Sequence, residues 1–507
     1  SELSRRMKPL GAVKRIEALG PYVNFFADWD KVGGAVIGNA LKQKDRYGSS
    51  SRKRGKVLVE FAHPNTHKAF HIGHARNITL GESLSRVLGF AGHDVIRANY
   101  QGDIGPHVAR CLWGVMNLGV REPRKDKGRW LGDVYAKASL RAGSRAVEGE
   151  IKQINKDLYA GKPALVQLWK RTRRWSLEYL AGIYREFGAK FDRLYFESEV
   201  EGPGIKLAKR LHELGVAKLS DGAIVMDLEK YKLGIYILLT RDGTPLYSIK
   251  DFILAEMQAK EHRPEKIVHV VGSEQDLHFR QLIKSLELTN PGLAKLERHL
   301  SYGLVNLQSG KMKSREGKVI LYEELRDRLL ENARKVTRKK NPKLGKKGLE
   351  EVARAVAMGA LKYDMIKVSP EKTITFDWER ALSFEGNNAP YLQYTHARCC
   401  SILRKSKTGG SGKFDPARLR DPLEVAVIRL VSEFPSVVGK SAEDMRPHYI
   451  ATYAYGLCDA FNHFYQFVPV LKADEGAKRA RLALVGAVRI TLGNALRLLG
   501  IWSPERM

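Results

Sequence analysis

The stretch EFAHPNTHKAFHIGHARN, residues 60–77, decides the fold because it carries the chain from an apolar run into a helical pattern. The run VLVEF, residues 57–61, predicts a buried strand, and a helix is expected over residues 71–89. The segment HDVIRANY, residues 93–100, predicts a second strand. Strand, helix and strand in this order open a βαβ unit, so the sequence predicts an α/β domain built on a parallel sheet.

Two imidazoles and a glycine, His71, Gly73 and His74, stand at the start of the predicted helix. A helix N-terminus presents free backbone N–H groups and the positive end of its dipole, which favour phosphate. Gly73 lets a base or a phosphate approach the backbone, and the histidines can donate to charge that develops during nucleotidyl transfer. The composition gives roughly 0.03 chance matches to H-x-G-H, so the motif alone is moderately specific.

Strand and helix patterns continue along the chain. Strand signals at residues 222–228, 234–240 and 265–272 predict a second βαβ half. Residues 130–190 carry apolar residues at helical spacing and predict a helical insertion within the sheet domain. From Tyr322 onward the pattern is helical to the end of the chain, so we expect a C-terminal helical bundle.

The composition limits the partners and the compartment. Lys plus Arg total 87 and Asp plus Glu total 56, a formal charge of +31 over 507 residues. This excess favours a polyanionic partner, nucleic acid before an acidic membrane surface. The four cysteines form no C-x-x-C pair, so a reducing, cytoplasmic compartment is expected, with neither a zinc site nor a disulfide framework. No signal peptide and no apolar run of ~18 residues is found, so no membrane partner is expected.

A second cationic motif, SGKMKSREGKVI, occupies residues 309–320. It carries Lys311, Lys313, Arg315 and Lys318 next to glycine, an arrangement that can fold over a triphosphate and stabilise departing pyrophosphate. Taken alone, the loop is better interpreted as a solvated basic turn.

Together, the two motifs resemble the signatures of the class I aminoacyl-tRNA synthetases, in which H-I-G-H precedes a K-M-x-x-R-type loop. Six stretches, in order, resemble the arginyl-tRNA synthetase family in particular, from about residue 20 to residue 507. They are EFAHPNTHKAFHIGHARN, NYQGDIG, DGTPLYSIKD, VVGSEQDLHF, FDWERALSFEGNNAPYLQYTHARCCSI and LLGIWSPERM. The resemblance implies a Rossmann-like parallel-sheet catalytic domain with a helical insertion, followed by an all-α helical-bundle domain that binds the anticodon.

The resemblance also implies a role for each matched position. Arginine has a guanidinium that forms bidentate hydrogen bonds with carboxylates. The positions matching its binding site are Glu60, Asn65, Tyr247, Asp251 and Gln275. The positions matching the ATP site are His71, Gly73, His74, Lys311, Lys313 and Gly272, and those expected to act in catalysis are His71, His74, Lys68 and Lys311. The positions matching contacts to the anticodon loop of tRNA are Tyr391 and Met507.

Several positions depart from the pattern of the family. Ser314 stands at the fourth position of the K-M-S-K-S-type loop, where a second lysine is common, and we expect Lys68 to take that role together with Lys311. His63 stands where Ser or Asn is common, and Lys250 replaces a frequent arginine. Roughly 55 residues precede Lys56, so we expect the family's N-terminal module, which grips the tRNA elbow, to be shortened and its RNA contacts to be reduced.

The resemblance divides the chain into four parts. They are a shortened N-terminal domain with a linker at residues 1–55, the catalytic domain at 56–320 with its insertion at about 115–235, a helical connecting region that contacts the tRNA stem at 321–388, and the anticodon-binding domain at 389–507. The implied activity is ATP-dependent activation of L-arginine to arginyl-adenylate and transfer to the 3′ end of tRNA(Arg). Mg²⁺ is expected with ATP, and the protein is expected to be a monomer.

Two alternatives stay open. A non-catalytic tRNA-binding paralogue would lose the histidines or the acidic residues, and all of them are present. A synthetase for another amino acid would need a different pocket: zinc ligands for cysteine, or a cationic pocket for glutamate or glutamine. Glu60 and Asp251 disfavour a cationic pocket.

Overall fold

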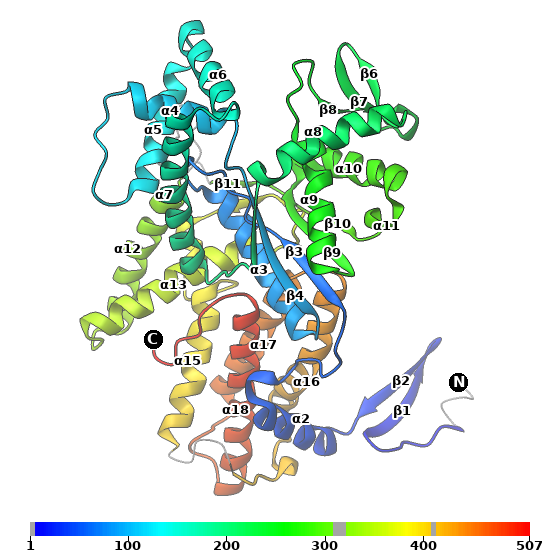
Figure 1. Ribbon diagram of the computed structural model, residues 1–507. Coiled ribbons are helices and arrows are strands. Elements are labelled where there is room, and N and C mark those ends of the chain that lie inside the picture. The colour runs from blue at the N-terminus through cyan, green and yellow to red at the C-terminus, as the bar shows by residue number, and fades with distance from the viewer. Residues whose placement is uncertain (1–5, 308–320, 407–411) are drawn as a thin grey trace.

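Five parallel strands form the central sheet of the computed structural model, which describes residues 6–307, 321–406 and 412–507 (Figure 1). The strands, in their order across the sheet, are β10 (Glu297–Tyr302), β9 (Lys266–Gly272), β3 (Lys56–Glu60), β4 (Asp94–Gln101) and β5 (Arg193–Phe196). The chain runs outward from β3 through β4 to β5 and later returns on the other side of β3. Ligands of open α/β sheets bind at the carboxyl ends of the strands where the order reverses, which here is between β3 and β9.

Helix α3 (Ile72–Phe90) covers one face of the sheet and is itself covered by C-terminal helices (Figure 1). Val57 and Val59 of β3 pack on this face, and most residues of α3 are buried. A Cβ at Gly81 would overlap the ring of Phe61, so glycine allows the close approach of α3 to the end of β3. The histidine motif at the start of α3 is therefore held between two packed layers.

The opposite face of the sheet is covered by α8 (Glu197–Glu213) and α9 (Tyr247–His262), and Leu58 of β3 packs there. Two helices, α10 (Asp276–Thr289) and the short α11 (Pro291–Ala294), connect β9 to β10. Successive side chains of a strand point to opposite faces, so Glu60 shares the α9 face with Leu58.

A helical lobe lies between β4 and β5, in the region where an insertion is predicted. Its helices are α4 (Pro106–Asn117), α5 (Lys127–Arg141), α6 (Arg145–Tyr159) and α7 (Pro163–Phe187). Strand β5 follows α7 and belongs to the central sheet, although it falls within the 115–235 range expected for the insertion.

A small antiparallel sheet lies between α8 and α9 and corrects one expectation. Its strands are β6 (Lys218–Ser220), β7 (Ala223–Asp227) and β8 (Ile235–Leu239). The strands predicted at 222–228 and 234–240 are therefore present, but the prediction that they form a second βαβ half is wrong. The second parallel unit consists of β9, α10 and β10, because short strand patterns do not reveal which sheet a strand joins.

Helices predominate after residue 321, as expected. They are α12 (Tyr322–Lys340), α13 (Lys346–Ile366), α14 (Trp378–Ala381), α15 (Ala389–Lys405), α16 (Pro422–Glu443), α17 (His448–Phe467) and α18 (Glu475–Leu498). One exception is β12 (Ile374–Phe376), which pairs in parallel with β11 (Val305–Leu307). One apolar core joins α15–α18 to the sheet through α3, so the bundle supports the histidine motif from behind.

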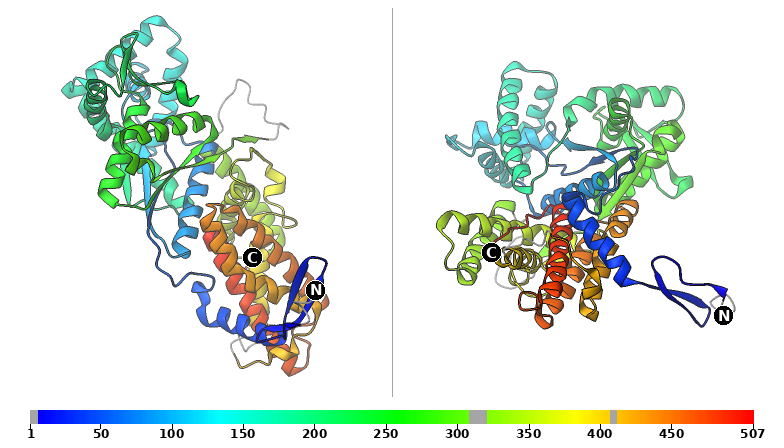
Figure 2. Two further views of the ribbon diagram at one scale, coloured as in Figure 1. Left: turned by 90° about the vertical axis from the view of Figure 1, so that its right-hand side faces the viewer. Right: turned by 90° about the horizontal axis from the view of Figure 1, so that it is seen from below.

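The N-terminal part consists of a hairpin, β1 (Val13–Leu19) and β2 (Tyr22–Ala27), followed by α2 (Trp29–Gln43). Figure 2 shows that the hairpin projects from the body of the molecule, whereas α2 packs against α16 and α18. Within the described ranges, no helix combines the length and the apolar character needed to cross a membrane.

Candidate active site

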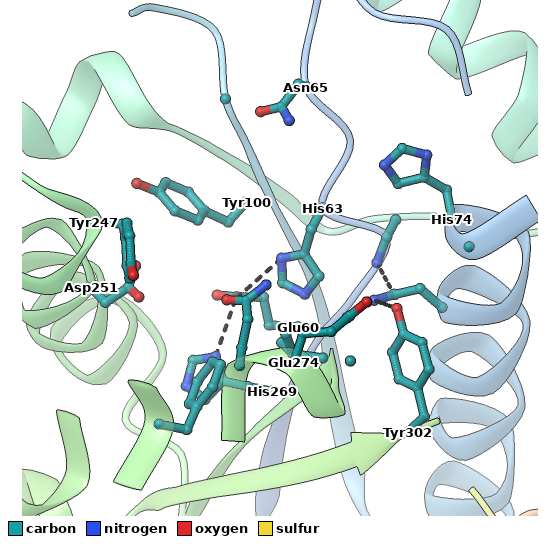
Figure 3. A pocket seen from close by; sticks show the side chains of 18 of the residues that line it. Glu60, His63, Asn65, His74, Tyr100, Tyr247, Asp251, His269, Glu274 and Tyr302 are labelled. Atoms are coloured by element: carbon teal, nitrogen blue, oxygen red, sulfur yellow. Dashed lines mark hydrogen bonds and ion pairs between the residues drawn. The ribbon is translucent and has the colours of Figure 1, made fainter. Parts of the chain in front are cut away.

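A cavity of about 640 Å³ opens at the carboxyl ends of β3, β9 and β10, where the strand order reverses (Figure 3). Its walls come from the loop after β3, the first turns of α3, α8 and α9, and the ends of the three strands. Ionisable side chains are frequent in its lining: Glu60, His63, His71, His74, Tyr100, Glu197, Tyr247, Asp251, His269, Glu274 and Tyr302.

His71 and His74 cap the first turn of α3. The Nδ1 atom of His71 accepts the backbone N–H of Gly73 at 3.2 Å, and Nδ1 of His74 accepts the backbone N–H of His71 at 3.2 Å. The ring centroids lie 3.7 Å apart. A Cβ at Gly73 would lie 3.0 Å from the His71 ring, so glycine leaves room for the arrangement. The H-x-x-H spacing thus builds a reciprocal capping box from two imidazoles.

Both histidines are neutral near pH 7. Burial, helped by the charge of Lys68, lowers the pKa of His71 to about 4. Burial, helped by the nearby His71, His63 and Lys68, also lowers the pKa of His74 well below its usual value. A neutral imidazole whose Nδ1 accepts a hydrogen bond carries its proton on Nε2. Each ring therefore keeps an Nε2–H donor, the group needed to contact a phosphate oxygen.

The loop between β3 and α3 has an unusual backbone. Ala62, His63 and His67 have positive φ angles of 83°, 46° and 64°, a region that residues other than glycine rarely adopt. The His67 ring anchors the loop through Nε2, which lies 2.8 Å from the hydroxyl of Thr172 on α7. Figure 3 shows the ring of His63 between the acidic side of the pocket and the histidine motif.

Glu60 ends β3 and is only 2% exposed at the base of the pocket. Nδ1 of His269 lies 3.1 Å from its Oε1, and Gln258 donates to its Oε2. Nδ1 of His63 lies 3.6 Å from Oε1. Burial would raise the pKa of Glu60, but His269, His63 and Gln258 together hold it below its usual value. The carboxylate is therefore an anion at neutral pH.

Asp251 and Tyr247 lie one turn apart at the start of α9 and line the same cavity. The Oδ2 atom of Asp251 is 2.7 Å from Nε2 of His278, and the ring of Tyr247 packs edge-on against His278 at 4.6 Å. Glu60 and Asp251 are far apart in the sequence, but both carboxylates lie in the cavity that the histidine motif also lines.

The other residues predicted for substrates fall into three groups. Three of them also line the cavity: Asn65, Gly272 and Gln275. Lys68 does not line it, and its ammonium lies 5.3 Å from the centroid of the Tyr135 ring. Lys311 and Lys313 lie outside the described residues. The roles of all these residues stay predictions.

Glu197 and Tyr100 line the cavity but are absent from the predicted site. Oε1 of Glu197 accepts a hydrogen bond from the buried ammonium of Lys250 at 2.6 Å. Burial raises the pKa of Glu197, although Lys250 opposes the rise. Burial and neighbouring carboxylates raise the pKa of Tyr100, so its hydroxyl stays protonated. The sequence holds one signal for Glu197, an acid at the carboxyl end of β5, but that strand has only four residues.

Tyr391 and Met507, predicted to contact RNA, lie on the C-terminal part of the chain and do not line the cavity. Tyr391 is half-buried in α15, and its hydroxyl accepts from Asn462 at 2.9 Å. Met507 lines a separate cavity of about 150 Å³ beside Phe384 and Tyr394. Their contact with RNA stays a prediction.

Comparison with known proteins gives matches over nearly the whole chain. Residues 36–378 match the family model described as tRNA synthetases class I (R), catalytic domain, and residues 392–507 match the DALR anticodon binding domain. The arginine–tRNA ligase of Bdellovibrio bacteriovorus is 36% identical over 501 residues, which cover 97% of this chain and 86% of that protein. The arginine–tRNA ligase of Clostridioides difficile is 33% identical and covers 100% of this chain and 90% of that protein.

Solved structures agree with these matches. The arginyl-tRNA synthetase of Thermus thermophilus superposes with a TM-score of 0.86 at 28% identity, covering 100% of this chain and 90% of that one. The arginyl-tRNA synthetase of Plasmodium falciparum, at 19% identity, shares the fold with a TM-score of 0.78, covering 98% of this chain and 86% of that one.

Proposed function

The chain belongs to the arginyl-tRNA synthetases of class I, and from this premise we propose how its pocket activates arginine. The activity is arginine–tRNA ligation: ATP-dependent activation of L-arginine to arginyl-adenylate, and transfer of arginine to the 3′ end of tRNA(Arg). The single observation that supports the proposed site is that Glu60, Asp251 and the histidine motif line one cavity at the reversal of the strand order.

The acidic side of the cavity suits a guanidinium. Glu60 and Asp251 would receive the arginine side chain, and Glu197 adds a third carboxylate that the sequence alone does not mark. Tyr247 and Gln275 flank this side, and both line the cavity. A planar cation with five N–H donors fits a set of separated carboxylates better than a single one. We assign Asn65 to the α-amino end of the substrate.

The histidine side suits the nucleotide. The Nε2–H groups of His71 and His74 would donate to phosphate oxygens, and Gly272 would lie next to the adenine. The described residues on either side of the segment 308–320, which carries Lys311 and Lys313, lie near this side: Val305 lines the cavity, and the N–H of Tyr322 donates to the carbonyl of Phe70 at 2.9 Å. We therefore assign Lys311 and Lys313 to ATP as well, and Lys68 as a nearby cation that raises the local positive potential.

The chemistry needs positioning and charge stabilisation rather than a covalent enzyme intermediate. The carboxylate of arginine attacks the α-phosphorus of ATP, and pyrophosphate leaves. The terminal ribose hydroxyl of the tRNA then attacks the activated carbonyl, and AMP leaves. A Mg²⁺ ion that accompanies ATP would be held mainly by the phosphates and water, as is usual for this ion at nucleotide sites.

The remaining features of the proposal concern the rest of the molecule. Tyr391 and Met507 would contact the anticodon loop, and the division of the chain at residues 1–55, 56–320, 321–388 and 389–507 would separate the parts that bind different regions of the tRNA. We also propose a monomer in the cytoplasm, where the four buried, unpaired thiols would stay reduced.

An aminoacylation assay tests the proposed pocket. Purified tRNA, ATP and each amino acid in turn are supplied to the wild type, to Asp251→Asn and to Glu256→Gln, an exposed acid on the same helix. Arginine alone should be attached by the wild type. Asp251→Asn should raise the KM for arginine about 10- to 100-fold, with little change in the KM for ATP, because a hydrogen-bonded charge is lost. An unchanged KM for arginine would show that Asp251 lies outside the arginine site.

A further inference from the structure

A row of three ionisable side chains crosses three neighbouring strands beneath the pocket. Glu60 of β3 and His269 of β9 are paired directly in the sheet register, and Glu297 of β10 is paired with Ile267, two residues before His269. All three side chains therefore lie on the face of the sheet that α9 and α10 cover. Their side chains are between 1% and 5% exposed.

His269 is held by a carboxylate on each side. Its Nδ1 lies 3.1 Å from Oε1 of Glu60, and its Nε2 lies 2.5 Å from Oε2 of Glu297. A neutral imidazole has only one N–H, so two ring nitrogens that both face carboxylate oxygens require an imidazolium. Burial would lower the pKa of His269, but Glu60 and Glu297 raise it well above its usual value. The row thus places a cationic ring between two acidic side chains.

The row connects the pocket to a residue outside the lining of the cavity. Glu60 and His269 line the cavity, whereas Glu297 does not. A buried carboxylate without a charged partner is costly and becomes protonated more easily. Gln258 donates to Oε2 of Glu60 but carries no charge, and Nδ1 of His63 is 3.6 Å away. His269 is therefore the group that keeps the Glu60 carboxylate charged and fixed in direction.

We propose that His269, anchored from behind by Glu297, is a positioning residue that aims the Glu60 carboxylate at the guanidinium of arginine. This inference rests on the assignment of Glu60 to the arginine site. It makes two further residues determinants of arginine affinity: His269, inside the apolar run of β9, and Glu297, at the start of β10. Since His269 acts through Glu60, its loss should change the use of arginine and leave the use of ATP almost unchanged.

A matched pair of substitutions tests the two hydrogen bonds of His269 separately. The amide nitrogen of Asn falls near the position of Nδ1, so His269→Asn keeps a donor toward Glu60. The amide nitrogen of Gln falls near Nε2, so His269→Gln keeps only the contact with Glu297. His269→Gln should raise the KM for arginine about tenfold or more, and His269→Asn should raise it clearly less. The KM for ATP should stay within about twofold in both variants.

His299→Gln is the control. His299 is the register partner of His269 on β10, and it contacts the carbonyl of Val271 and the ring of Phe279 instead of Glu60. This variant should keep the wild-type KM for arginine. If the His269 variants do not fold, as judged by thermal unfolding, the nearly isosteric Glu297→Gln replaces them and should also raise the KM for arginine selectively. An unchanged KM for arginine in whichever of these variants is folded would overturn the proposal.

A double substitution separates this inference from the proposed function. If His269 acts through Glu60, then Glu60→Gln combined with His269→Gln should be no worse for arginine than Glu60→Gln alone. Additive losses would show that His269 acts independently and would refute the positioning role. If Glu60→Gln itself leaves the KM for arginine unchanged, the assignment of Glu60 fails; if only the His269 variants are silent, the further inference fails alone.

Discussion

The pocket at the ends of β3 and β9 and the bundle of α15–α18 differ in the kind of side chain that they bury. Beneath the pocket, charged and polar groups are buried, as in the Glu60–His269–Glu297 row, and the adjoining backbone has positive φ at Ala62 and His63. In the bundle, most buried side chains are aliphatic or aromatic. Several polar groups there serve as caps at helix ends, as at Asn388 and Asp421.

The difference assigns stability mainly to the apolar core that the bundle shares with α3, and the proposed chemistry to the charged groups buried around the pocket. Apolar burial in the bundle stabilises the fold, because each buried side chain contributes transfer free energy and dispersion contacts. Buried charges in the pocket are costly unless each finds a partner, and the proposed contacts with the substrates would account for their presence there. Substitutions in the bundle should therefore change the free energy of unfolding, and substitutions in the pocket should change the kinetics.

Phe461→Ala should show the largest effect on stability. Phe461 is fully buried in α17 and packs against Phe464 with ring centroids 6.0 Å apart. Its truncation should lower the free energy of unfolding by about 3–5 kcal/mol, measured by denaturant titration. Phe467→Ala, on the same helix but at a 65% exposed position, should stay within about 0.5 kcal/mol of the wild type. The comparison between the two regions fails if folded Phe461→Ala enzyme has an altered KM for arginine.

His74→Ala should show the largest effect on chemistry. Loss of one donor to charge that develops in the transition state should lower kcat for adenylate formation about 100- to 1,000-fold, or about 3–4 kcal/mol. His74→Asn is the sharper variant, because its Oδ1 can replace Nδ1 as the acceptor for the His71 N–H while the Nε2–H donor is lost. Both variants should be equally slow and bind tRNA as the wild type does. Near-normal turnover in His74→Asn would show that His74 only caps the helix and does not act in the reaction.

The same division explains how much the sequence predicts. The strand at 57–61, the helix at 71–89 and the C-terminal helices follow from apolar periodicity, and the structure confirms them as β3, α3 and α12–α18. Apolar periodicity does not show which strands share a sheet. The segments of β7 and β8 are as apolar as those of a buried parallel strand, yet they form the small antiparallel sheet. Glu60, Asp251 and the histidines are marked by family motifs, and the structure brings them into one cavity.

The rest of the pocket has no local signal. His269 lies inside the apolar run KIVHVVG, where a single histidine has no distinctive pattern, and its partners come from other strands. Glu197 is separated from the histidine motif by the whole helical lobe, and only the packing of β5 beside β4 brings it to the cavity. The places of His269 and Glu197 in the pocket depend on which strands pair in the folded protein. A single sequence does not reveal this pairing.

Asp421→Ala should show the smallest effect and tests the bundle at its polar boundary. Asp421 caps α16: its Oδ1 accepts the N–H of Leu423 at 2.9 Å, and its own N–H donates to Oε2 of Glu424 at 2.9 Å. Removal of the cap should lower the free energy of unfolding by about 1 kcal/mol, whereas Asp421→Ser keeps an acceptor and should retain most of the stability. Both variants should aminoacylate tRNA at the wild-type rate. A loss in Asp421→Ala as large as that in Phe461→Ala would show that polar caps stabilise the bundle as strongly as its apolar core, and the contrast with the pocket would then disappear.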